Sequence, residues 1–65
     1  MNGGIEMNQL VIGKYISLKR KQKNMTQEQL AEKLGVSNKT ISKWETGKCM
    51  PDYSIVRNLC EELDI

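Results

Sequence analysis

Apolar residues recur at helical spacing in four short segments of this 65-residue chain. No stretch alternates apolar and polar residues convincingly, as a half-buried strand would. The pattern therefore predicts an all-α fold, a small bundle of four short helices. The residues expected to face its core are Ile12, Tyr15, Ile16, Leu30, Ala31, Leu34, Ile41, Trp44, Ile55, Val56, Leu59, Cys60 and Leu63.

Capping residues mark the ends of the first two helices. Asn8 can cap the first helix, which should end near Lys23, where Asn24 can take the left-handed conformation. Thr26 opens the second helix, and Gln29 three residues later completes a capping box. We expect residues 1–7 to be a flexible leader and residues 8–65 to form one domain.

The remaining helices are bounded in the same way. Gly35 ends the second helix, Ser37 caps the third, and Gly47 ends it. Pro51 and Asp52 open the fourth helix. Local sequence signals thus mark where most of the predicted helices begin and end.

The second and third helices are joined by only about three residues, so they must cross steeply and touch near the turn. In the window from Gln27 to Thr46, small Ala31 is fifth, Gly35 is ninth and Ile41 is fifteenth. Alanine permits close approach, glycine permits a positive φ at the turn, and isoleucine fills the angle between the helices. This spacing is typical of the DNA-binding helix-turn-helix.

The segment MTQEQLAEKLGVSNKTISKWETGKCMPD resembles the Cro and phage-repressor type of helix-turn-helix regulators, the XRE family. The resemblance covers residues 12–63 and implies a lambda-repressor-like DNA-binding domain. Members usually carry a fifth helix beyond the position of Ile65, which often helps to form a dimer. We therefore expect either a domain truncated before that helix or the front of a longer protein. Members also place an aliphatic residue where this chain has Lys19, so the stem of Lys19 should lie along the core edge or the first helix should be slightly rotated.

Charge is distributed unevenly, although the net charge is only +2. Residues 1–48 hold nine Lys or Arg and four Asp or Glu, whereas residues 49–65 hold one Arg and four acids. Such asymmetry indicates an anion-facing surface, and a solvated lysine-rich helix face explains it equally well.

The resemblance identifies the third helix as a recognition helix, whose first residues approach base edges in the major groove. Asn38 suits a bidentate contact to adenine, and Lys39 or Lys43 suits guanine. In the family the matching positions are the main base readers, and Ser42 is a weaker candidate. The alternative is that these side chains only solvate an exposed helix face.

Phosphate contacts are expected from helix N-termini, where free N–H groups favour an anion. The family commonly uses the position of Gln27 to hold the DNA backbone. Capping alone also explains Thr26 and Ser37. The expected phosphate-binding residues are Gln27, Ser37, Thr40, Thr46, Gly47 and Lys48.

Two further assignments concern structure rather than DNA. In the family, residues matching Arg20 and Glu45 form an ion pair that ties the first helix to the recognition helix. Trp44 lies opposite the polar side of its helix, so we interpret it as a core anchor and not as a base-stacking platform.

Enzymatic and metal chemistry have little support in the sequence. The chain contains no histidine, and Cys49 and Cys60 lack the spacing and companions of a zinc site or a catalytic base. We expect both cysteines to be reduced in a cytoplasmic protein that uses no metal or cofactor. No apolar stretch approaches membrane length.

The leading hypothesis is a transcriptional regulator that binds double-stranded DNA sequence-specifically, as a repressor and a homodimer on a near-palindromic operator. Within DNA binding, an antitoxin that regulates its own operon is an alternative, with the acidic fourth helix or further C-terminal chain holding the toxin. A phage immunity repressor and a restriction controller are equally open. A docking module that kept the fold without reading bases is the alternative from another class.

Overall fold

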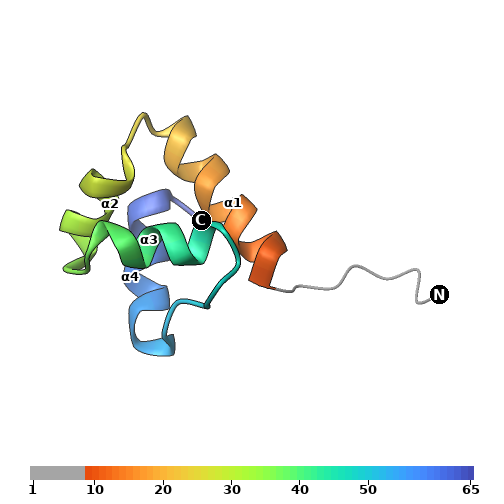
Figure 1. Cartoon of the computed structure of the whole chain (residues 1–65). Coiled ribbons are helices and arrows are strands. Elements are labelled where there is room, and N and C mark those ends of the chain that lie inside the picture. The colour runs from red at the N-terminus through yellow and green to blue at the C-terminus, as the bar shows by residue number, and fades with distance from the viewer. Residues whose placement is uncertain (1–8) are drawn as a thin grey trace.

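The computed structural model describes residues 9–65, and these residues form four α-helices and no strand (Figure 1). The all-α prediction is confirmed for this part of the chain. The predicted leader, residues 1–7, and the predicted cap Asn8 lie outside the described residues. The helices are α1 (Gln9–Gln22), α2 (Gln27–Leu34), α3 (Asn38–Glu45) and α4 (Tyr53–Leu63).

The capping pattern around α2 agrees with the sequence prediction. The Thr26 hydroxyl accepts a hydrogen bond from the Gln29 backbone N–H at 3.0 Å, and the Gln29 side chain accepts one from the Thr26 N–H at 2.9 Å. Asn24, with φ 58°, and Gly35, with φ 74°, both adopt the left-handed conformation that ends a helix. Local chemistry thus defines both ends of α2.

The ends of α3 and α4 are less uniform. The Ser37 hydroxyl accepts from the Thr40 N–H at 3.3 Å, as an N-cap does. Asp52 precedes α4, but its carboxylate makes no capping bond and accepts from the Ser54 hydroxyl at 2.5 Å. Gly47, with φ 80°, lies in the turn after α3.

The core lies between the helices, and α3 packs against both α1 and α2. Its buried hydrophobic residues are Ile16, Leu30, Ala31, Ile41, Trp44, Leu59 and Leu63. Leu34, Ile12 and Ile55 are half-buried and pack against this core. Trp44 is 3% exposed, so it has no free ring face for stacking on a base.

The prediction that Tyr15 and Val56 face the core is wrong. Tyr15 is 44% exposed on α1, and Val56 is 37% exposed on α4. Helical spacing groups them with their buried neighbours, but the packing of the helices leaves these two side chains partly in contact with solvent. Lys19 is half-buried, and its ammonium lies 5.9 Å from the centre of the Tyr15 ring. This position agrees with a lysine whose stem follows the core edge.

Gly13 is where α1 crosses the end of α3, and the sequence prediction did not single it out. A Cβ atom at Gly13 would overlap the Trp44 carbonyl oxygen and lie 3.0 Å from the Glu45 carbonyl carbon. The backbones of the two helices therefore touch at this point. The contact fixes how closely α3 packs against α1.

Candidate nucleic-acid interface

The exposed side of α3 consists of polar and basic side chains. Asn38, Lys39 and Lys43 are exposed and Ser42 is half-buried, whereas Ile41 and Trp44 fill the core. Asn38 and Lys39 are the first two residues of α3, as predicted. Because a helix N-terminus carries free N–H groups and a partial positive charge, this end of α3 attracts an anion.

Glu45 is the single acidic residue of α3, and it points into the fold. Its two carboxylate oxygens accept hydrogen bonds from Arg20, with Nε to Oε2 at 2.6 Å and Nη2 to Oε1 at 3.1 Å. The side chains of Arg20 and Glu45 are only 9% and 6% exposed. The structure thus contains the ion pair expected from the family, and the exposed charges of α3 are the two lysines.

Gln27 joins this ion pair. Its side-chain nitrogen donates to Glu45 Oε1 at 3.0 Å, across from α2 to α3. Arg20 Nη1 also donates to the Met25 carbonyl oxygen at 2.6 Å, so one guanidinium holds α1, the loop before α2 and the end of α3 together. The family resemblance predicts only a phosphate contact for Gln27, and nothing in the sequence indicates its hydrogen bond to Glu45.

Burial and hydrogen bonding shift the pKa of Glu45 in opposite directions. Burial raises the pKa of Glu45, but the hydrogen bonds from Arg20 and Gln27 and the charge of Arg20 lower it by more. The net pKa lies below the ordinary value of 4.5. Glu45 is therefore ionised at neutral pH and can only accept hydrogen bonds.

The Ser37 and Thr40 side chains bond to each other at the start of α3. Their hydroxyl oxygens lie 3.1 Å apart, and the Ser37 oxygen also accepts from the Thr40 N–H. Ser37 therefore acts as a helix cap. A hydroxyl that caps a helix can still form further hydrogen bonds. Capping by Ser37 is therefore compatible with the predicted contact to a phosphate, which stays a prediction.

The turn after α3 uses its N–H groups internally. The N–H groups of Thr46, Gly47 and Lys48 donate to the carbonyls of Ser42, Trp44 and Lys43, at 3.0, 3.1 and 2.8 Å. The Thr46 hydroxyl donates to the Ser42 carbonyl at 2.8 Å as well. Gly47 shapes the turn, since a Cβ there would lie 3.1 Å from the Leu10 Cα atom. Of these three residues, Lys48 has the exposed cation that suits a phosphate.

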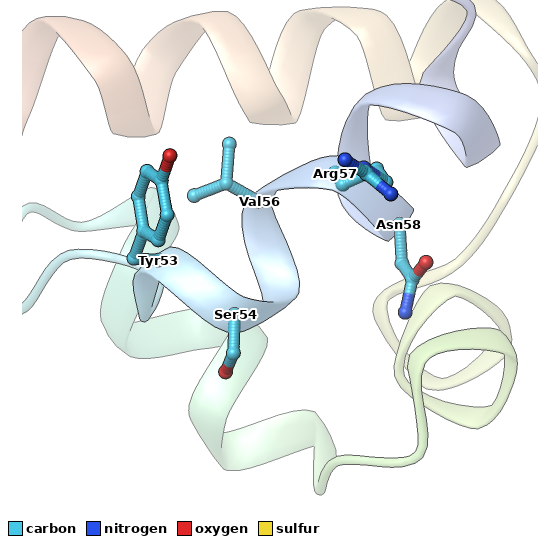
Figure 2. A pocket seen from close by; sticks show the side chains of 5 residues that line it. All are labelled: Tyr53, Ser54, Val56, Arg57 and Asn58. Carbon is cyan, nitrogen blue, oxygen red and sulfur yellow. The ribbon is translucent and has the colours of Figure 1, made fainter.

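A shallow depression on α4 is lined by Tyr53, Ser54, Val56, Arg57 and Asn58. Figure 2 shows Tyr53 and Val56 projecting to one side of α4, with Ser54 and Asn58 on another. No carboxylate, thiol or second base accompanies Arg57 among these lining residues.

Residues 9–65 contain neither a cluster of metal-binding side chains nor a membrane-spanning helix. In this part of the chain, no three His, Cys, Asp or Glu side chains gather closely enough to hold a metal ion. None of its helices is long and apolar enough to cross a membrane.

Comparisons with known proteins agree with this geometry. A family model described as Helix-turn-helix matches residues 16–65. The HTH-type transcriptional activator BcrR of Enterococcus faecalis is 64% identical over 35 residues, which are 54% of this chain and 17% of BcrR. The HTH-type transcriptional regulator YqaE of Bacillus subtilis (strain 168) is 39% identical over 46 residues, which are 71% of this chain and 40% of YqaE.

A solved structure shares the fold. The clp gene regulator ClgR from C. glutamicum superposes with a TM-score of 0.82 at 22% identity, over 97% of this chain and 81% of that chain. The matched region of this chain spans less than half of the length of BcrR and of YqaE. Because the family model matches most of the chain, the chain belongs to the helix-turn-helix family of DNA-binding transcriptional regulators, as its resemblance to the Cro and phage-repressor type predicts.

Proposed function

We propose that this domain binds specific sequences of double-stranded DNA by placing α3 in the major groove. The observation that carries the proposal is the division of charge on α3. Lys39 and Lys43 are exposed, while Glu45, which would repel phosphates, is neutralised by Arg20 inside the fold. A helix with this surface presents donors to base edges and no anion to the DNA backbone.

Base reading is assigned to the first turn of α3 and the turn that follows. Asn38 offers both a donor and an acceptor, the pair of groups that adenine requires. Lys39 and Lys43 offer donors to the O6 and N7 acceptors of guanine. Ser42 is half-buried, so its contribution is the smallest of the four.

Phosphate binding is assigned to both ends of the helix-turn-helix. At one end, Gln27 opens α2, where the free N–H groups of the first turn meet an anion. At the other end, exposed Lys48 follows α3. Ser37 and Thr40 add hydroxyl groups between these positions, while Thr46 and Gly47 support the turn that carries Lys48.

The regulator is proposed to act as a homodimer on a near-palindromic operator. Two recognition helices must then lie about 34–36 Å apart, one turn of the DNA. Repression is the sign proposed from the resemblance to phage repressors, and the activator BcrR shows that the relatives include the opposite sign.

A test by nuclear magnetic resonance locates the DNA-binding surface. Duplex DNA of mixed sequence is added to the 15N-labelled chain, and the shifts of the backbone amides are mapped. The proposal predicts shifts at Gln27 and along residues 38–43, with the amides of residues 53–58 on α4 unchanged. Shifts centred on α4, or none at low salt, would contradict the proposal and favour a docking module.

A further inference from the structure

We propose that Glu45 is a positioning residue for DNA binding, which holds the Gln27 side chain in the orientation that offers an N–H group to a phosphate. This inference rests on the proposed function, because it needs Gln27 to contact the DNA backbone. It assigns to the buried ion pair a role beyond joining α1 to α3.

The orientation of the Gln27 amide is set by the chemistry of its partner. A glutamine side chain carries a carbonyl oxygen and an NH2 group, and a half rotation exchanges them. An ionised carboxylate only accepts hydrogen bonds, so Glu45 selects the nitrogen, which lies 3.0 Å from Oε1. The reversed amide would place two acceptors against each other. The carboxylate thus selects one of the two orientations.

One of the two N–H groups of that nitrogen is used by Glu45, and no other hydrogen bond of the Gln27 side chain is found within residues 9–65. Gln27 is half-buried and is the first residue of α2. Its second N–H therefore lies at a helix N-terminus, beside the free backbone N–H groups of the first turn. A phosphate there would meet this N–H together with the free backbone N–H groups, although the carboxylate of Glu28 lies in the same turn.

Arg20 makes this arrangement rigid. Its Nη2 shares Glu45 Oε1 with Gln27, and its Nη1 holds the Met25 carbonyl next to the cap of α2. Both the backbone and the side chain at the start of α2 are thereby fixed against α3. A side chain ordered before binding loses less entropy on binding, which is worth roughly threefold to tenfold in affinity.

The test is a double-mutant cycle on the affinity for a short labelled duplex of mixed sequence at fixed salt. Gln27→Met keeps the length of the side chain and removes the amide. Glu45→Asp keeps the charge facing Arg20 and withdraws the carboxylate from Gln27. We expect each variant to weaken binding by roughly threefold to tenfold, and the double variant to bind no more weakly than Gln27→Met alone. Lys48→Ala, in contrast, should weaken the wild type and Glu45→Asp by the same factor.

Two results of the cycle would overturn the inference. If Glu45→Asp weakened Gln27→Met as much as it weakens the wild type, Glu45 would act independently of Gln27. If Gln27→Met bound DNA as tightly as the wild type, Gln27 would not contact the phosphate. Circular dichroism establishes that the variants compared are folded.

A second measurement is independent of DNA and of the stability of the variants. The side-chain NH2 protons of Gln27 in the wild-type chain should shift with pH as Glu45 titrates, because they donate to its carboxylate. Unchanged signals through that titration would overturn the inference. If the wild-type chain bound no duplex, the proposed function would fail, and this titration would still show whether Glu45 holds the amide.

Discussion

Gly13 of α1 lies directly against the carbonyl oxygen of Trp44 in α3, with no space for a side chain between the two backbones. Gly13→Ala should therefore destabilise the domain by about 2–3 kcal/mol, because the two helices must move apart. The higher helix propensity of alanine offsets about 1 kcal/mol at most. Urea unfolding followed by circular dichroism measures the effect.

Lys14→Ala is the matched control for Gly13→Ala. Lys14 is the neighbouring residue of α1 and is exposed, so its replacement should change the free energy of unfolding by less than about 0.5 kcal/mol. Equal stability of Gly13→Ala and Lys14→Ala would show that α1 and α3 do not meet closely at Gly13.

The Arg20–Glu45 and Lys23–Asp64 ion pairs should differ strongly in their contribution to stability. Arg20→Met leaves the Glu45 carboxylate buried without its partner and should cost about 3–5 kcal/mol. Lys23→Met removes the pair with Asp64, whose side chain is 76% exposed, and should cost less than about 1 kcal/mol. Thermal or urea unfolding measures the loss of stability in each variant. Equal losses would contradict the burial of the Arg20–Glu45 pair.

Acid should weaken the fold through Glu45. Because its pKa in the folded chain lies below the ordinary 4.5, the unfolded chain binds the proton more readily. The stabilisation is complete above about pH 4.5 and is lost as the pH falls through the pKa of the folded state. The free energy of unfolding, measured by urea between pH 7 and pH 3, should therefore fall more steeply for the wild type than for Glu45→Gln.

Two exposed acids, Asp52 and Asp64, do not change the direction of the pH effect predicted for Glu45. Hydrogen bonds from Ser54 lower the pKa of Asp52, and the Lys23 side chain lowers the pKa of Asp64. Both carboxyls are exposed and are retained in Glu45→Gln, so the difference between the two chains isolates Glu45. Identical pH profiles would mean that the carboxyl of Glu45 is not stabilised in the folded state.

Base reading and phosphate binding should respond differently to substitution. Asn38→Ala should cost about 1–3 kcal/mol at the preferred site and relax the specificity at one base position. Lys48→Ala should weaken binding to all sequences and reduce the slope of log K against log salt by about one. Anisotropy titrations with the preferred duplex and a scrambled duplex separate the two effects. If Asn38→Ala weakened both duplexes equally, its assignment to a base would be wrong.

The helix boundaries could be predicted because their signals are local. Thr26 with Gln29 and the left-handed Gly35 act within one turn of the chain. The helix-turn-helix followed from the spacing of Ala31, Gly35 and Ile41, since two helices so close in sequence have little choice of crossing. The polar face of α3 followed from the same periodicity.

Contacts between distant segments could not be predicted from such signals. The passage of α1 over Trp44 at Gly13 and the bond from Gln27 to Glu45 join residues on different helices. The exposure of Tyr15 and Val56 has a related cause. Periodicity predicts an apolar stripe but not how much of its width a neighbouring helix covers.

The central claim is sequence-specific DNA binding, and selection from a pool of randomised duplex DNA tests it most directly. We expect an enriched inverted repeat whose half-sites are one turn of DNA apart, about 34–36 Å, or a multiple of it. A single enriched half-site would support base reading by α3 and contradict the proposed dimer. Salt-sensitive binding with no enriched sequence would contradict the claim.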